Sequence, residues 1–179
     1  MIPRRTITLY PGILSDLSRF LARPQGEEAI RSFETAFARY IGVEHAVATS
    51  SGTDAMLAIL DGMGLRSGDH LLSTAYTIQP LVRTLIARGY DLELLDISPE
   101  DCNLDVDDLA RRLRPQTKAV IVTHMFGTPA RMDEIRGIVS DHPCALIEDA
   151  AHAHGADYRG VRCGALGDAA FFSFDQVKP

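Results

Sequence analysis

The chain has 179 residues, of which 46% are hydrophobic and 23% charged, and its formal net charge is -6. This size and composition suit one globular domain with a real core. The negative balance gives no electrostatic case for binding nucleic acid or an anionic membrane. No apolar run approaches the length of a membrane span, and the three cysteines lie far apart without CxxC spacing. We therefore expect a cytoplasmic protein.

Short apolar runs alternate with amphipathic helical patterns along the chain, which is typical of strands joined by helical crossovers. In chain order, the predicted elements are a helix at 27–42, a strand, turn and helix within 45–65, a strand at 69–74, a helix at 79–89, a strand at 91–97, a helix at 106–113, a strand at 119–127, a helix at 132–142, a strand at 144–150, a hairpin or loop at 156–168 and a strand at 169–174. Because the strands are apolar on both sides, we predict an α/β fold with a mostly parallel sheet and helices on both faces.

In such sheets, ligands bind beyond the carboxyl ends of the strands. Four polar stretches come directly after predicted strands, and they read "SSGTD", "HMFG", "EDAAHAH" and "SFDQVK". The chemistry of the protein is therefore expected in these four stretches.

The turn "TSSGTDAM" joins a predicted strand to a predicted helix. The unpaired backbone N–H groups at a helix N-terminus can hold a phosphate, and Gly52 would permit close approach while Thr53 adds a hydroxyl. The alternative is that Ser50 or Ser51 simply caps the helix, as is very common. The stretch lacks the spacing of a P-loop or of a dinucleotide-binding turn.

The stretch "ALIEDAAHAHGA" brings Glu148 and Asp149 to the end of an apolar strand, where a carboxylate needs a cation or a strong donor. His152 follows Asp149 by three residues and can share its side of a helical turn. A metal site is disfavoured, because His152 and His154 are two residues apart and no third ligand is obvious. A capped turn with a satisfied histidine is the structural alternative.

In "FFSFDQVKP", Ser173 alternates with two phenylalanines and Lys178 comes after the strand. A lysine in a desolvated pocket can attack a carbonyl group and form a Schiff base, although most single lysines are ordinary surface residues. A phosphate site, a carboxylate and a lysine at one sheet edge are the set that pyridoxal phosphate needs.

These residues resemble, in order and spacing, the DegT-type nucleotide-sugar aminotransferases, which are fold-type-I pyridoxal-phosphate enzymes. The likeness rests on "SSGTDAM", "HMFGTPARMDEI", "IEDAAHAHGADYRGVRCGALGD" and "FFSFDQVK", and it extends from about Phe33 to the end of the chain. It implies that the chain is the amino-terminal portion of the large cofactor-binding domain. The expected organisation is an amino-terminal arm at 1–26 and a truncated large domain at 27–179, without the small domain.

The resemblance also implies roles for the catalytic residues. Asp149 would pair with the ring nitrogen of the cofactor, and His152 would lie near its phenolic oxygen. Lys178 would hold the cofactor covalently and, once released, move a proton. In this family a relative with histidine at the lysine position performs dehydration, so Lys178 favours transamination.

The remaining cofactor contacts follow from the same resemblance. Gly52, Thr53 and Asp54 match the phosphate-binding turn, and Ser173 matches a second phosphate contact. One departure is the pair Thr77-Ile78, where the family usually has an aromatic residue that stacks on the cofactor ring. Stacking is then lost at Ile78 or passes to Tyr76.

The expected reaction moves an amino group from glutamate or glutamine to a nucleotide-linked keto sugar, in a homodimer whose second subunit contributes to the cofactor pocket. Family members are about twice as long, so the activity of this chain alone is a separate question. The alternatives are a non-catalytic remnant, a binding partner of a full-length paralogue, or another fold-type-I activity on an amino acid.

Overall fold

A computed structural model describes residues 11–12, 15–16, 18 and 26–175. The described residues fall into two compact units, one that ends at residue 48 and includes residue 175, and one that spans residues 49–174. None of the helices in the described ranges is both long and apolar enough to cross a membrane.

The first unit contains the helix α2 (Gly26–Ile41), which confirms the helix predicted at 27–42. Acidic Glu27 and Glu28 occupy its first turn, where they complement the positive end of the helix dipole. The helix ends at Gly42, which has a φ of 91° and donates its amide to the Ala38 carbonyl at 2.8 Å. A left-handed residue at this position is the usual way to end a helix, and glycine adopts it without steric cost.

Residues 43–50 form neither helix nor strand, so the strand predicted at the start of 45–65 is wrong. An extended segment becomes a strand only when a neighbour pairs with its backbone groups, and none of the described strands pairs with this segment. The Ala48 amide instead donates to the Glu34 carboxylate at 2.8 Å, and the Val47 side chain is 78% exposed.

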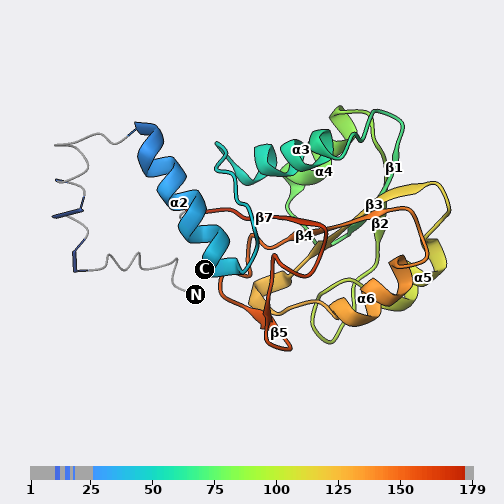
Figure 1. The fold of residues 1–179 in the computed structure, drawn as a ribbon. Helices are drawn as coiled ribbons and strands as arrows, with labels where there is room; N and C mark the ends of the chain where they lie inside the picture. Colours follow the sequence, from blue (N-terminus) through green and yellow to red (C-terminus); the bar gives the residue numbers. More distant parts are fainter. Residues whose placement is uncertain (1–10, 13–14, 17, 19–25, 176–179) are drawn as a thin grey trace, which may run out of the picture. The chain divides into compact units, whose positions relative to one another are not determined.

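The second unit is built on a sheet with the strand order β2-β1-β3-β4-β7, in which every neighbouring pair is parallel. Its strands are β1 (His70–Thr74), β2 (Asp91–Leu95), β3 (Thr117–Thr123), β4 (Ala145–Asp149) and β7 (Ala169–Phe171). The helices that cover it are α3 (Gly52–Gly62), α4 (Gln79–Ala87), α5 (Val106–Arg112) and α6 (Met132–Val139). In Figure 1, α3 and α4 lie over one face of the sheet and α5 and α6 over the other. The predicted fold class is confirmed.

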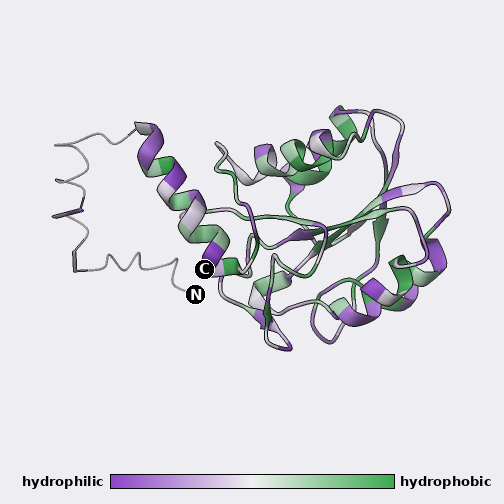
Figure 2. Ribbon diagram, viewed as in Figure 1, coloured by the Kyte–Doolittle hydropathy of each residue, from purple (hydrophilic) through white to green (hydrophobic). Residues whose placement is uncertain are grey.

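Each face of the sheet has its own apolar core, and alternate strand residues supply the two cores. The core under α3 and α4 includes Met56, Leu60, Leu81, Leu85 and Ile147. The core under α5 and α6 includes Val106, Leu109, Met132, Ile135 and Leu146. The sheet strands are mainly hydrophobic in Figure 2, whereas hydrophilic residues gather on the outer sides of the helices and in turns.

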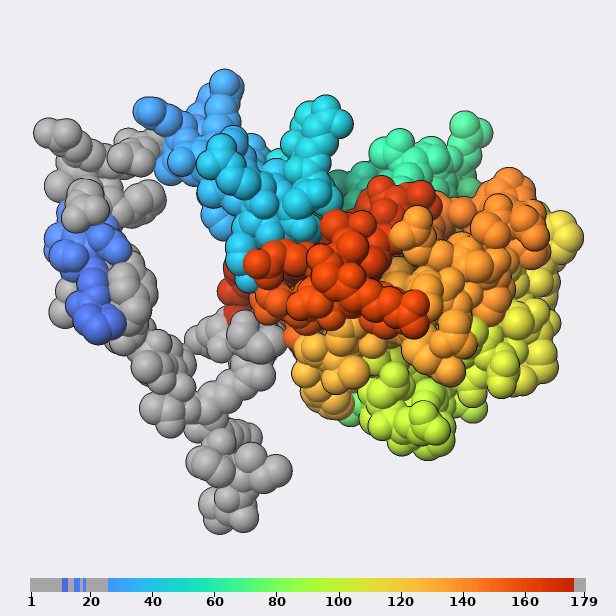
Figure 3. Space-filling model, turned by 60° about the horizontal axis from the view of Figure 1, so that its bottom comes forward, coloured from blue at the N-terminus to red at the C-terminus, as the bar shows by residue number. Residues whose placement is uncertain are grey.

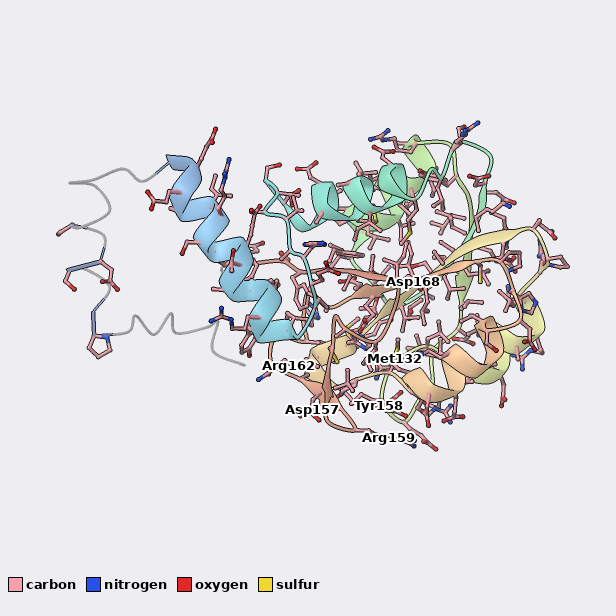
Figure 4. The ribbon with its side chains drawn as sticks, viewed as in Figure 1. Met132, Asp157, Tyr158, Arg159, Arg162 and Asp168 are labelled. Carbon is pink, nitrogen blue, oxygen red and sulfur yellow. The ribbon has the colours of Figure 1, made fainter. Side chains whose placement is uncertain are left out.

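A short antiparallel hairpin, β5 (Asp157–Tyr158) and β6 (Val161–Arg162), follows β4. Its turn places Arg159 at a φ of 54° and the next glycine at 85°, as in the type I′ turns that suit two-residue hairpins. The Tyr158 hydroxyl donates to Asp133 on α6, and the Arg159 guanidinium lies 2.6 Å from the same carboxylate. Figure 4 shows the hairpin residues beside the start of α6, and Figure 3 shows this region on the surface.

The fully buried Glu148 carboxylate connects this hairpin region to the sheet. It accepts hydrogen bonds from three backbone amides, those of Gly164, Leu166 and Gly167, each at 2.7 Å. A fourth donor is the His124 Nε2 atom at 2.9 Å. The loop after the hairpin is therefore folded around one carboxylate at the end of β4.

The hydrogen bonds of His124 define its tautomer. The Ala130 amide donates to Nδ1 at 3.1 Å, so that Nδ1 carries a lone pair and Nε2 carries the proton donated to Glu148. Burial alone would raise the pKa of Glu148, but the bonds from His124 and from the amides outweigh it. Together they hold the pKa of Glu148 below its ordinary value of 4.5.

The same loop is also bonded to β4 through its backbone. The Asp168 amide donates to the Leu146 carbonyl, and the Leu146 amide donates to the Asp168 carboxylate, both at 2.8 Å. Gly167 lies so close that an added Cβ would be 2.5 Å from the Leu146 oxygen. These contacts fix where β7 begins.

The Gly167→Ala substitution is expected to lower the free energy of unfolding by about 2–3 kcal/mol, because the new methyl meets a backbone oxygen that cannot move freely. Urea unfolding followed by circular dichroism measures this change. Gly137→Ala on α6 is the matched control, because nothing lies within 4 Å of its added Cβ. It should stabilise the helix by roughly 0.5–1 kcal/mol. Equal effects of the two substitutions would contradict the packing argument.

The Glu148→Gln substitution is expected to lower the free energy of unfolding by roughly 3 kcal/mol at pH 7, because an amide group would face N–H donors. Above pH 4.5 the carboxyl is ionised in both folded and unfolded states, so its full contribution is present. Below pH 4.5 the unfolded chain takes up the proton first, and the contribution is lost as the pH falls through the lower folded pKa.

The difference between wild type and Glu148→Gln should therefore narrow as urea unfolding is repeated from pH 7 down through pH 4.5. The exposed Glu100 gives the control, since Glu100→Gln should stay within about 0.5 kcal/mol of wild type. If the difference in the free energy of unfolding widened as the pH fell, it would contradict an ionised Glu148 in the folded protein.

Candidate functional site

Asp149 is the last residue of β4 and lies at the carboxyl edge of the sheet, where the sequence places it. It is 3% exposed and is paired in register with Thr123 at the end of β3. Its Oδ2 atom accepts the Thr123 hydroxyl at 3.4 Å, and its Oδ1 atom accepts the Ala151 amide at 3.1 Å. Because strand residues alternate, Asp149 lies on the sheet face covered by α3, whereas Glu148 lies on the opposite face.

The N-terminus of α3 lies at the same edge. Ser51 caps the helix by accepting the Asp54 amide at 3.1 Å, so the capping alternative raised from the sequence is confirmed. The amides of Gly52 and Thr53 donate no hydrogen bond within the described part of the chain. Two N–H groups at the positive end of an 11-residue helix are thus available to an anion.

Ser173 lies against this N-terminus. A Cβ atom added to Gly52 would be 3.3 Å from the Ser173 Cβ and 3.2 Å from the Phe172 oxygen. The structure therefore brings the Gly52–Thr53 turn and Ser173 together, although 121 residues of sequence separate Gly52 from Ser173. Only a residue without a side chain lets the two backbones approach this closely.

Asp54 contributes to this turn in a different way. Its carboxylate accepts hydrogen bonds from the hydroxyls of Ser50 and Ser51, the latter at 2.9 Å. These bonds lower the pKa of Asp54 below its usual value. Because its amide is used by the cap and its carboxylate is negative, Asp54 stabilises the turn and offers no free donor to a phosphate.

Tyr76 and Ile78 follow the end of β1 by two and four residues, and they occupy different environments. Ile78 is the N-cap of α4 and is 40% exposed. The Tyr76 ring contacts Phe126 edge-on, with 5.9 Å between centroids and an interplanar angle of 68°. Tyr76 thus belongs to an aromatic group at the carboxyl edge.

Phe126 is a residue of this edge that sequence reasoning did not single out. It lies in the 3-10 helix η1 (Met125–Gly127) directly after β3, with a φ of 53° and a ψ of 26°. Its ring stacks on His152 with 6.1 Å between centroids and 17° between planes. The sequence indicates "HMFG" as a polar stretch after a strand, but the aromatic residue inside it makes the contacts.

The two histidines of "EDAAHAH" have different neighbours. His152 stacks on Phe126, whereas the His154 ring contacts Phe172 at 5.4 Å and Phe174 at 5.0 Å. Within the described ranges, no group of three His, Cys, Asp or Glu side chains could hold a metal ion. Lys178 lies outside the described residues, five positions after Ser173.

Comparison with known proteins places this arrangement in a family. The model of the DegT/DnrJ/EryC1/StrS aminotransferase family matches residues 22–179. The GDP-perosamine synthase of Caulobacter vibrioides is 40% identical over 145 residues, which are 81% of this chain and 39% of that protein.

Two solved structures share the fold. An aminotransferase from Psychrobacter cryohalolentis has a TM-score of 0.90 and 30% identity, over 98% of this chain and 46% of that one. A GDP-4-keto-6-deoxymannose-3-dehydratase with a trapped PLP-glutamate geminal diamine has a TM-score of 0.73 and 27% identity, over 77% and 37%.

The chain thus spans less than half the length of these relatives. The family match covers most of the chain, including every site residue predicted from the sequence. On these grounds the chain belongs to the DegT/DnrJ/EryC1/StrS aminotransferase family.

Proposed function

We propose that this chain forms the cofactor-binding part of a pyridoxal-phosphate-dependent aminotransferase that acts on a nucleotide-linked keto sugar. The observation that carries the proposal is the close approach of Gly52 to Ser173. Beside it, the N–H groups of Gly52 and Thr53 donate no hydrogen bond within the described residues. This turn lies on the sheet face that also holds Asp149. This arrangement offers an anion site and a buried carboxylate at one sheet edge.

The residues present fit the cofactor. The Gly52 and Thr53 amides and the Ser173 hydroxyl are donors of the kind that a phosphate group needs. Asp149 is a buried carboxylate of the kind that a protonated ring nitrogen needs. Both features lie on the same side of the sheet, at its carboxyl edge.

Asp149 would accept a hydrogen bond from the ring nitrogen and keep the proton on that atom. The bonds that it receives from Thr123 and Ala151 would hold its carboxylate in place while it does so. When bound, pyridoxal phosphate supplies an electron sink for the substrate carbon that carries nitrogen. Lys178 would bind the cofactor aldehyde and then carry the proton to and from that carbon.

His152 would lie beside the phenolic oxygen of the cofactor, with its ring plane set by Phe126. We propose glutamate or glutamine as the amino donor, and the PLP-glutamate adduct held by one similar structure supports glutamate. The nucleotide sugars in the names of two similar proteins support the sugar as acceptor. We further propose that the protein works in the cytoplasm as a homodimer with two subunits sharing each pocket.

The first test is cofactor binding. Adding pyridoxal phosphate to the protein should produce the visible absorbance band of the lysine-bound cofactor, and Lys178→Ala should abolish that band. Asp149→Asn should keep the band but lower turnover with a keto sugar by about 10²–10⁴-fold, because an amide cannot hold the ring proton in the same way. Asp107→Asn, at an exposed position on α5, is the control. A wild-type protein without any band would contradict the proposal.

The second test concerns the phosphate. Gly52→Ala should raise the Kd for pyridoxal phosphate roughly tenfold, because the methyl would crowd Ser173 and the Phe172 oxygen. Gly62→Ala, at the other end of α3, has nothing within 4 Å of its added Cβ and should bind the cofactor as wild type does. Absorbance titration measures both constants. Equal Kd values for the two variants would show that the cofactor phosphate does not bind at the α3 N-terminus.

A further inference from the structure

The strand β2 forms one end of the sheet, because β1 is its only strand neighbour in the described part of the chain. The Asp91 amide and the Leu95 carbonyl bond to residues at the two ends of β1, at 3.0 and 2.8 Å. Backbone groups alternate in direction along a strand, so those of Leu92 and Leu94 point away from β1. Among the described residues these outward groups have no hydrogen-bond partner. The strand thus presents an unpaired edge.

An apolar surface begins at this edge, on the side of the sheet that α4 covers. Leu92 packs against the core under α3 and α4, whereas Leu95 belongs to the core on the opposite face. Because side chains alternate along a strand, Leu94 lies on the same side as Leu92. Its side chain is 39% exposed.

The helix α4 continues the apolar surface. Val82 and Ile86 are four residues apart, so they share one flank of the helix. On the other flank, the Arg88 guanidinium lies 3.6 Å from the Asp61 carboxylate of α3. Since α3 contacts β7 and α4 contacts β2, the flank turned away from α3 lies beside the β2 edge. Ile86 on this flank is 60% exposed.

The opposite side of the edge is basic. Glu93 lies on the α5 side, where its carboxylate is 2.9 Å from the Arg112 guanidinium and 2.8 Å from that of Arg114. Both arginine side chains are about half exposed, at 45% and 48%. A charge on an edge strand normally keeps other strands away, but here two cations compensate Glu93. An added strand would meet apolar side chains on one side and guanidinium groups on the other.

We propose that the β2 edge pairs, in antiparallel direction, with the same edge of a second copy of this chain. The strand reads DLELL, so that acidic residues alternate with leucines. A two-fold axis perpendicular to the sheet keeps the α4 side of both copies on one face. The leucines of one copy would then meet the apolar surface of the other, and Glu93 would meet its arginines. The strand thus has the alternation that its own edge requires.

The register follows from the positions of the outward backbone groups. With the two-fold axis at Glu93, Leu92 of each copy is opposite Leu94 of the other, and each of these pairs exchanges two N–H···O bonds. Like charges directly opposite are unfavourable, but each Glu93 at the axis is flanked by the arginines of its own copy. This contact lies at the end of the sheet, apart from the cofactor pockets of the proposed homodimer, and it does not rest on the proposed function.

The test uses two variants of the whole chain, Leu94→Lys on β2 and Ile86→Lys on α4. Both positions are exposed, so circular dichroism should show an unchanged fold. Val161→Lys is the matched control, because Val161 is a 44% exposed apolar residue in the strand β6. Sedimentation equilibrium over a range of concentrations gives the mass of each protein and the Kd for association.

Each lysine variant should raise the association Kd roughly tenfold or more, because the ammonium group would lose hydration against leucines. At concentrations between the two Kd values, the wild type should have about twice the mass of either variant, and Val161→Lys should behave as wild type does. Hydrogen exchange of the Leu92 and Leu94 amides should slow as the wild-type concentration rises, and it should stay fast in Leu94→Lys.

Equal masses of the wild type and both lysine variants at every concentration would overturn the pairing of β2 with a second copy. Exchange of the Leu92 and Leu94 amides at a rate independent of concentration would also overturn it. Slow exchange throughout would then mean that another segment or partner covers the edge, and fast exchange that nothing does. Both measurements give an answer whether or not the visible cofactor band appears, so failure of this inference is distinguishable from failure of the proposed function.

Discussion

The arrangement of the second unit depends on one buried charge, the carboxylate of Glu148. A carboxylate removed from water is unfavourable unless donors replace the lost hydration. Here the donors come from two separate segments, the loop at Gly164–Gly167 and the end of β3 at His124. Since neither segment can leave without exposing an uncompensated charge, the carboxylate determines how the hairpin loop and the β3 turn are placed against β4.

Two neighbouring carboxylates on β4 have different roles because successive side chains of a strand point to opposite faces of the sheet. Glu148 and Asp149 are adjacent in sequence, yet they lie on opposite faces of the sheet. His124 and Thr123 at the end of β3 divide in the same way, and each bonds the carboxylate on its own face. The hydrogen bonds to Glu148 on the α6 side can therefore be strong without using the Asp149 carboxylate on the α3 side.

Much of this architecture could be predicted from local sequence. The apolar runs predict the parallel strands, and the rule that ligands bind at carboxyl ends points to Asp149, Ser173 and the α3 turn. The strand expected at the start of 45–65 failed, because strand formation depends on a partner that local pattern cannot supply. The acceptor role of Glu148 was equally inaccessible, since its partners are 16–24 residues away in sequence.

Phe126 shows a physical reason why local sequence cannot predict every residue of the site. An exposed phenylalanine in a glycine-containing turn has no periodicity, and its significance lies in a positive φ and in two ring contacts made across strands. Both depend on the fixed positions of His124 and Asn103, and His124 is fixed in turn by Glu148. The buried charge on one face of the sheet thus holds the strained turn that presents a ring at its edge.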